Sequence, residues 1–378
     1  MVRYNRKWFL SAFLSLCLVL MSSIQVAEAA VGDAYWLGSG DYTNHDISRT
    51  NSAQLLYSNN PENVPAVYAG KQTLLFGKVC PSGSSRIFLA HTNSTGQSIK
   101  LGIVVAPYSG GSVTVTISKR GIADPSTDYP NVGKQAEQRW FPSAISEPVT
   151  ATTYTQLDSS LPAKTLTNSQ NINAIYDVSA NAQFRMWIVA VPSSQSILTG
   201  FPNFYWPTES GRDGSSDEDF KAKGIFRGER MMSNSSYYAY DTAQGIRRIR
   251  IGHFFDSDST NDTLNTSSWD GWMPTTVGET GIGEFLPGNY GALYRFELRV
   301  KSTDGRRLAV LIRPRCNNTV AGAANMGGSI VGYGPYSSIN YGYVLSEHTL
   351  GSSETVIWFN LMPAANSFLP QEIILYPY

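Results

Sequence analysis

Charged side chains are scarce in this chain, and neither sign dominates. They make up 15% of the 378 residues, with 29 basic and 29 acidic side chains. A nucleic acid or an anionic membrane would need a clustered positive surface on the protein. The densest basic cluster, Arg247, Arg248 and Arg250, alternates with isoleucines, which is typical of a half-buried strand. The composition therefore argues against nucleic acid as a partner.

Recognisable catalytic motifs are also absent. The sequence has no Gly-x-Ser-x-Gly, no His-Glu-x-x-His, no phosphate-binding loop, no dinucleotide fingerprint and no Cys-x-x-Cys. Its four histidines, His45, His91, His253 and His348, are not paired at metal-ligand spacing. A glycosidase needs only two carboxylates at the right separation in space, and sequence spacing in a β protein cannot reveal that separation. That class of enzyme stays open.

Long hydrophobic runs are missing except at the N-terminus. Residues 8–24 carry no charge, follow a basic segment that ends at Lys7, and precede Ala27 and Ala29. This order is typical of a secretory signal peptide, and the run is short for a membrane span. We expect cleavage after Ala29 or after the next residue. The mature protein would then be secreted, extracellular or at the cell surface, with no membrane span.

Helical patterns are rare, whereas strand patterns recur along the chain. The sequence is rich in turn-forming and aromatic residues, with 33 Gly, 19 Pro and 21 Tyr. Residues 132–140 and 217–223 carry the best helical patterns. Short β-branched and aromatic runs predict strands at residues 68–79, 85–91, 97–105, 112–119, 183–191, 247–255, 293–301, 307–313, 356–361 and 373–376. We predict an all-β fold, an antiparallel β-sandwich or jelly-roll.

Two segments of the chain resemble each other. Residues 88–107 read FLAHTNSTGQSIKLGIVVAP, and residues 296–314 read FELRVKSTDGRRLAVLIRP. Each contains a strand pattern, a Ser-Thr turn that ends in Gly96 or Gly305, a second strand pattern and a proline. Because a tight hairpin turn needs a residue that accepts positive φ, the glycines indicate two β-hairpins.

The similar segments suggest a division of the chain. We predict a signal peptide at residues 1–30, a first sandwich domain at 31–200 and a second at 201–378, with the boundary in the aromatic and proline-rich stretch 200–207. A single large sandwich that uses both hairpins is the alternative.

Several runs resemble known proteins. These are LLYSNNPENV (55–64), FLAHTNSTGQ (88–97), GNYGALYRFELRV (288–300), LIRPRCNN (311–318) and ANSFLPQEIILYP (365–377). The chain resembles a group of secreted, β-rich proteins of Gram-positive bacteria, some of which carry a module similar to the N-terminal domain of copper amine oxidases. The resemblance implies a cell-envelope or extracellular setting and brings no activity with it. Copper amine oxidase chemistry is not supported, since both Asn-Tyr pairs precede Gly rather than an acidic residue and no His-x-His occurs.

Cys80 and Cys316 are the only cysteines outside the predicted signal peptide. In an oxidising compartment two such cysteines are expected to be joined rather than free. Each also falls at an end of one of the two similar segments. We therefore predict a disulfide between them.

One acidic loop has the ligands that calcium prefers. Asp256, Asp258, Asn261 and Asp262 place side-chain oxygens close together on a polar segment. Calcium is the cofactor that this loop would bind, although the loop does not match the twelve-residue EF-hand pattern. A second acidic loop at residues 213–219 is a weaker candidate. A solvated acidic turn is the alternative for both loops.

Aromatic residues outside the strand patterns are the remaining functional signal. Tyr205 and Trp206 lie between prolines, and Trp269 and Trp272 flank an Asp-Gly turn in a polar loop. Exposed loop aromatics beside Asp and Asn can stack on sugar rings, so these four residues are candidate ligand-binding residues. The alternative is that they close the ends of a sandwich.

The functional prediction is a secreted, non-enzymatic protein of the cell envelope or extracellular matrix. It would act by binding, with cell-wall or extracellular polysaccharide as the partner, or by contributing structure. The alternative is a secreted polysaccharide-active hydrolase or lyase.

Overall fold

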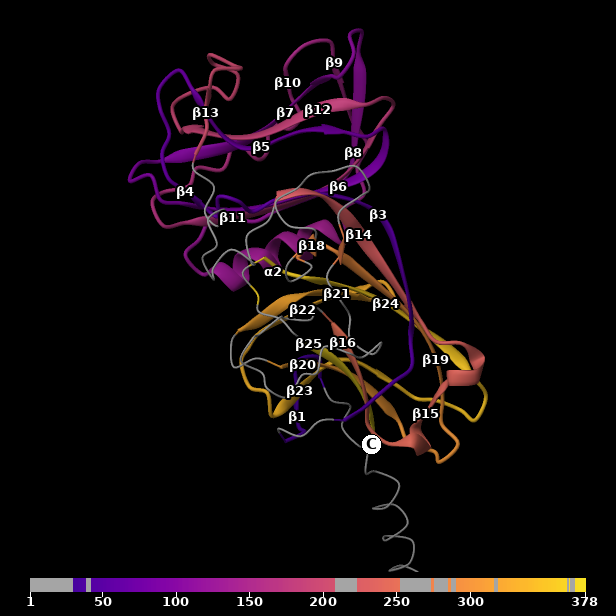
Figure 1. Cartoon of the computed structure of the whole chain (residues 1–378). Coiled ribbons are helices and arrows are strands. Elements are labelled where there is room, and N and C mark those ends of the chain that lie inside the picture. Colours follow the sequence, from indigo (N-terminus) through magenta and orange to yellow (C-terminus); the bar gives the residue numbers. More distant parts are fainter. Residues whose placement is uncertain are drawn as a thin grey trace, which may run out of the picture.

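The computed structural model confirms the all-β class, with α2 (Tyr129–Trp140) as the α-helix of the described part of the chain (Figure 1). The structure describes residues 30–38, 42–207, 223–251, 273–274, 285–286, 290–315, 319–365, 367 and 371–378.

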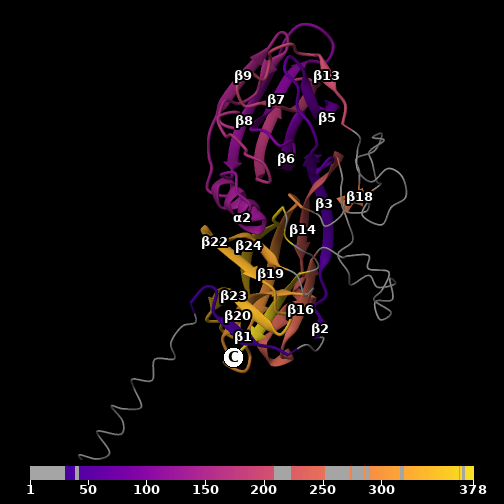
Figure 2. The ribbon, with the colours of Figure 1, turned by 90° about the vertical axis from the view of Figure 1, so that its left-hand side faces the viewer.

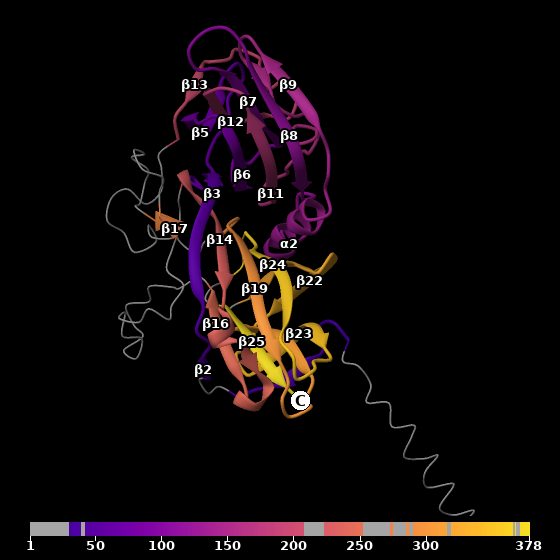
Figure 3. The ribbon, with the colours of Figure 1, turned by 90° about the vertical axis from the view of Figure 1, so that its right-hand side faces the viewer.

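The largest sheet runs through the whole molecule and contains twelve described strands. Ten of them follow one another in the order β22 (Ser329–Tyr336), β21 (Val320–Met326), β24 (Thr355–Pro363), β19 (Leu293–Lys301), β14 (Lys223–Ser233), β3 (Ser48–Ser58), β6 (Gly83–Asn93), β11 (Asn171–Ala180), β8 (Val113–Ile122) and β9 (Glu147–Ala151). The short strand β4 (Asn63–Val64) pairs with β6, and the short strand β15 (Tyr240–Asp241) pairs with β19. Figures 2 and 3 show β3 and β14 passing from one half of the molecule into the other.

Two smaller sheets lie at opposite ends of the molecule (Figure 1). The five-stranded sheet has the order β10 (Thr155–Gln156), β7 (Ile99–Pro107), β12 (Phe184–Pro192), β5 (Gln72–Cys80) and β13 (Phe204–Tyr205). The six-stranded sheet has the order β1 (Ala34–Trp36), β23 (Tyr341–His348), β20 (Leu308–Pro314), β25 (Gln371–Pro377), β16 (Arg247–Ile251) and β2 (Thr43–Asn44). A further pair joins β17 (Met273–Pro274) to β18 (Phe285–Leu286), and two 3₁₀ turns are η2 (Ser236–Tyr238) and η3 (Thr242–Gln244).

Two large hydrophobic cores hold these layers together, and β6 contributes to both. Ile87 and Leu89 pack into the core shared with the five-stranded sheet. Phe88 and Ala90 point to the opposite face of β6 and pack into the core that contains α2 and the six-stranded sheet. Successive side chains of a strand face opposite ways, so β6 is buried on both sides and reads as a continuous apolar run.

Helix α2 lies at the junction of the two halves and confirms the helix predicted at residues 132–140 (Figures 2 and 3). Val132, Ala136 and Trp140 recur every four residues and form its buried face. The second predicted helix, at residues 217–223, lies outside the described residues except for Lys223, which begins β14.

The hairpin interpretation of the two similar segments is wrong. The strands of the first segment, β6 and β7, belong to different sheets, and so do β19 and β20 of the second. Gly96 and Gly305 do have positive φ, at 76° and 78°. The prediction of a turn glycine is therefore correct, but the turn connects strands of two different sheets. The error arose because alternation along a strand does not say which sheet the strand joins.

The two halves of the chain share one strand order. In the largest sheet β3-β6-β11-β8-β9 corresponds to β14-β19-β24-β21-β22, taken outward from the centre. In the smaller sheets β10-β7-β12-β5-β13 corresponds to β23-β20-β25-β16-β2. This correspondence is what an internal duplication predicts. The boundary at residue 200 stays a prediction, and strands β1 and β2 pair with strands that follow it.

Most strand pairs are antiparallel, as predicted, but the sheets are mixed. β3 pairs in parallel with β6, and β14 pairs in parallel with β19. In each case the intervening strand, β5 or β16, crosses to a smaller sheet and lets the chain return in the same direction.

Candidate functional site: an aromatic surface on the five-stranded sheet

The chain beyond β12 folds back over the outer face of the five-stranded sheet. Ile197 packs there against Leu74, Val104 and Val189. A Cβ atom on Gly102 would lie 2.7 Å from the Ile197 side chain, so glycine is needed for this approach. The covering segment therefore follows a fixed path along the sheet.

One buried amide also holds the covering segment. The Gln72 side chain donates to the carbonyl oxygens of Thr199, at 2.6 Å, and Ile197, at 3.4 Å. The segment then joins the sheet as β13, whose Phe204 and Tyr205 pair in parallel with β5. The backbone position of the predicted residue Tyr205 is thus set by the sheet.

The covering segment completes a chain of five aromatic rings. The ring centroids of successive neighbours are 4.8 to 5.9 Å apart. Most of the pairs are edge-to-face, a favourable arrangement for aromatic rings. The rings belong to Tyr154, Trp187, Phe201, Phe204 and Trp206.

The two ends of this chain are open to solvent, whereas its middle is partly buried. Trp206 is 70% exposed and Tyr154 is 39% exposed. Tyr205 is half-buried, and its ring packs edge-on against Tyr68 at 4.9 Å. The structure therefore places the predicted residue Trp206 at the exposed end of the ring chain, whereas the predicted residue Tyr205 packs against Tyr68 outside that chain.

A cation lies on the same face of β12. Arg185 and Trp187 are two residues apart on this strand, so they point the same way. The Arg185 guanidinium lies 5.6 Å from the ring centroid of Tyr108, which is itself 44% exposed. The aromatic surface, defined here as Tyr154, Trp187, Phe201, Phe204 and Trp206, is thus bordered by a further ring and a hydrogen-bond donor.

Sequence reasoning missed Tyr154, Trp187 and Tyr68. They lie in separate parts of the chain, before β10, within β12 and before β5, and no spacing in the sequence relates them. Only the pairing of β7, β12 and β5 brings them beside residues 201–206.

Two buried carboxylates of the described residues, Asp158 and Glu372, contact arginine. Asp158 lies 3.0 Å from Arg120 and accepts a hydrogen bond from the Tyr176 hydroxyl at 2.8 Å. Glu372, fully buried, lies 3.1 Å from Arg248. Such pairing fits carboxylates that stabilise the fold. The hydrolase or lyase alternative stays a prediction. We assign no catalytic acid and base among these carboxylates.

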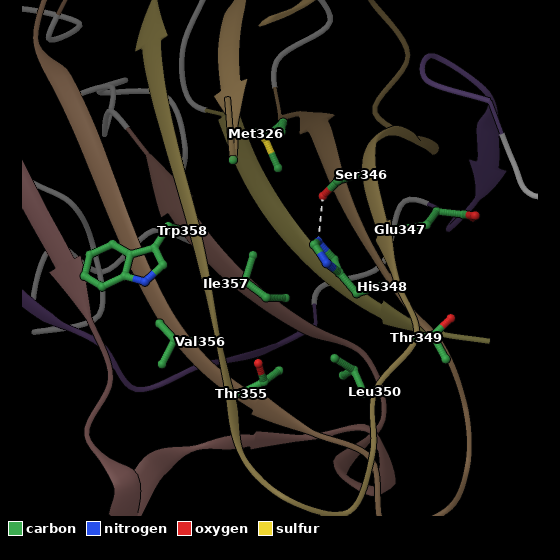
Figure 4. A pocket seen from close by; sticks show the side chains of 11 residues that line it. Met326, Ser346, Glu347, His348, Thr349, Leu350, Thr355, Val356, Ile357 and Trp358 are labelled. Carbon is green, nitrogen blue, oxygen red and sulfur yellow. Dashed lines mark hydrogen bonds between the residues drawn. The ribbon is translucent and has the colours of Figure 1, made fainter. Parts of the chain in front are cut away.

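A pocket of about 490 Å³ lies between β23 and β24, in the other half of the molecule (Figure 4). The Ser346 hydroxyl lies 2.9 Å from Nε2 of His348, and burial lowers the pKa of His348. A Ser-His pair acts as nucleophile and base when a third group orients the histidine. Glu347 points to the opposite side of β23 and contacts Tyr35 and Arg307 instead (Figure 4). The pocket therefore has no complete triad among its described lining residues.

Several predicted site residues lie outside the described residues. These are Trp269, Trp272, Asp256, Asp258, Asn261, Asp262 and Cys316. Cys80 ends β5 and is buried in the core beneath the five-stranded sheet. The disulfide and the calcium loop stay predictions. Within the described part of the chain, no group of three or more His, Cys, Asp or Glu side chains could hold a metal ion.

Comparison with known proteins gives no family for this chain. No family model matches it, and no curated protein matches it. Among the described residues no helix combines the length and the apolar character needed to cross a membrane.

Proposed function

We propose that this protein binds polysaccharide of the cell envelope or extracellular matrix through the aromatic surface, without catalysing a reaction. The observation that carries the proposal is the five-ring chain that ends in Trp206, a tryptophan that directly follows β13 and is 70% exposed.

The chemistry of the surface suits a sugar polymer. Pyranose rings present C–H faces that stack on aromatic rings, while their hydroxyls need hydrogen-bonding groups nearby. Tyr154 supplies a phenol hydroxyl within the surface, and Arg185 supplies guanidinium donors beside it. A row of rings favours an extended ligand such as a glycan chain.

The proposal includes export and an oxidising location. The signal-peptide pattern of residues 1–30 supports export, and Cys80 and Cys316 would form a disulfide there. Protein recovered from a secreting host should begin at Ala30 or Val31 and should contain no alkylatable thiol when unfolded without reductant. Two alkylated thiols would contradict the disulfide, and a mass that retains residues 1–29 would contradict export.

Replacing the exposed ring tests the binding site directly. Trp206→Ala should weaken retention on insoluble polysaccharide by roughly thirtyfold, about 2 kcal/mol, as loss of a central tryptophan does at other interfaces. Because Trp206 is largely exposed, the melting temperature of the Trp206→Ala variant should stay close to that of the wild type. Pull-down on peptidoglycan sacculi, chitin and cellulose measures the first effect, and calorimetry measures the second.

Trp358→Ala is the matched control. Trp358 is 53% exposed and lies on β24, away from the five-stranded sheet. It should bind polysaccharide as the wild type does. Equal loss in both variants would show nonspecific adhesion, and wild-type protein that binds none of the three polymers would overturn the proposal.

A further inference from the structure

A second pocket lies where the β2–β3 connection meets the end of β14. Its volume is about 440 Å³, and its lining comes from residues 44–49 and from 233–235 with Tyr238. These two stretches are distant in sequence, and β3 and β14 pair along their whole length with Ser48 opposite Ser233. The pocket is therefore separate from the aromatic surface and belongs to the other half of the molecule.

Hydrogen bonds hold the two walls of the pocket together. The Ser48 hydroxyl donates to the Ser233 carbonyl oxygen at 2.8 Å. The Asn234 amide lies 2.9 Å from Nε2 of His45 and also donates to the Tyr238 carbonyl oxygen at 3.0 Å. Oδ1 of Asn234 accepts from the backbone of Arg299 at 2.7 Å, so the asparagine fixes both walls to the sheet. A ligand would meet a preformed site, which lowers the entropy cost of binding.

The floor of the pocket is polar but uncharged at neutral pH. His45 is buried, and burial lowers its pKa to about 4. Its Nε2 faces the amide of Asn234, which is a donor, so the neutral ring accepts there and carries its proton on Nδ1. His45 and Asn234 therefore offer a ligand hydrogen-bonding groups that carry no charge.

The mouth carries the groups that recognise a hydroxylated ring. Asp46 is exposed, and its carboxylate can accept hydrogen bonds from ligand hydroxyls. Arg49 also lines the pocket, with a buried Nε and an Nη1 that donates to the Ile47 carbonyl oxygen at 3.5 Å. Tyr238 is 57% exposed, and its ring offers an apolar face at the rim. A sugar hydroxyl can donate to the Asp46 carboxylate while the C–H face of the sugar ring lies on the tyrosine.

We propose that this pocket is a monosaccharide-sized binding site for a neutral pyranose, whether a free sugar or the end of a glycan chain. The proposal rests on the lining of the pocket itself and does not depend on polymer binding at Trp206. It gives the protein a second, short-ligand site in the half that lacks the five-stranded sheet.

The test uses a panel of four probes, the methyl glycosides of glucose, galactose, mannose and N-acetylglucosamine. Saturation-transfer NMR on the full-length mature protein should detect binding of at least one of them. Asp46→Asn should weaken that binding about tenfold or more, because a charged acceptor becomes a neutral one. Tyr238→Ala should weaken it by a similar factor through loss of the ring face.

Tyr237→Ala is the matched control. Tyr237 is 95% exposed, immediately precedes Tyr238 and is not among the residues that line the pocket. It should leave binding unchanged, and Asp46→Asn should melt at the wild-type temperature because the side chain is exposed.

Three results would overturn the site. These results are a wild type that binds none of the four glycosides, a Tyr237→Ala variant that binds as weakly as Tyr238→Ala, and a Trp206→Ala variant that no longer binds. The last result would place the sugar on the aromatic surface, which leaves the proposed function intact while removing this pocket from it.

Discussion

At the scale of single residues, the buried carboxyl of Glu137 matters most for the response to pH. It lies on α2 in the first half and accepts a hydrogen bond from the Ala323 amide of β21 at 2.7 Å. Burial raises the pKa of Glu137 well above its usual value. The folded protein therefore retains a proton that the unfolded chain releases, and the free energy of unfolding falls as pH rises above about 4.5.

We predict that Glu137→Gln removes this penalty. Glutamine keeps the carbonyl acceptor for Ala323 and has no charge to bury. The variant should be more stable than the wild type at neutral pH, and the difference should shrink as pH falls toward about 4.5. Urea unfolding across that range measures it.

Glu137→Ala provides the comparison. It removes the acceptor and leaves the Ala323 amide unsatisfied, so it should cost about 1–3 kcal/mol even at low pH. If the free energy of unfolding differs between wild type and Glu137→Gln by the same amount at every pH, the Glu137 carboxyl does not release its proton when the protein unfolds in this pH range.

The sequence identified only part of the candidate site at this scale. Tyr205 and Trp206 could be selected because they lie between prolines outside any strand pattern. Trp187 could not, since it alternates within a strand and reads as a core or surface residue. In the second pocket Asp46 and Tyr238 carry no local pattern at all, and they meet only through the pairing of β3 with β14.

At the scale of elements, the contact between α2 and β8 depends on one glycine. A Cβ atom on Gly121 would lie 2.6 Å from the Cβ of Trp140 and would also meet the carbonyl oxygen of Ala136. We predict that Gly121→Ala displaces the helix and costs about 1–3 kcal/mol. Thermal unfolding measures the loss.

Gly351→Ala is the control for this change, because no atom lies within 4 Å of a Cβ built there. It should change stability by no more than about 0.5 kcal/mol. If Gly121→Ala is tolerated equally well, the helix must be free to shift on the sheet.

The sequence predicted individual strands well and their partners poorly. All ten predicted strand segments overlap strands of the structure, and residues 293–301 coincide with β19. Several long strands were missed, namely β3, β11, β14, β21, β22 and β23. In β3 and β21 the sequences SRTNSAQLLYS and VAGAANM are too polar or too rich in small residues to show a strand pattern. Pairing could not be predicted because a period of two says nothing about neighbours, so arches were taken for hairpins.

At the scale of the whole molecule, the two halves should unfold together. Leu55, Tyr57 and Phe88 of the first half share one core with Phe296 and Val310 of the second. The largest sheet also continues through β3 and β14 without a break in pairing between the halves. We predict a single cooperative transition, with circular dichroism and tryptophan fluorescence melting at the same temperature.

A fragment spanning residues 201–378 tests the same idea. It lacks β3, which covers one side of β14, and it lacks β1 and β2 of the six-stranded sheet. The fragment should therefore fail to give a cooperative melt. Two separate transitions in the intact chain, or a stably folded fragment, would show instead that each half is autonomous.

The makeup of the six-stranded sheet also governs when the chain can fold during synthesis. Ala34 pairs with Tyr343, and β25 lies in the interior of the sheet between β20 and β16. β1 therefore has no partner until β23 has been made, and the sheet lacks an interior strand until β25 follows. Contacts this distant in sequence slow folding and prolong the exposure of strand edges to aggregation. A nascent chain of this design would depend on holding factors until β25 has been made.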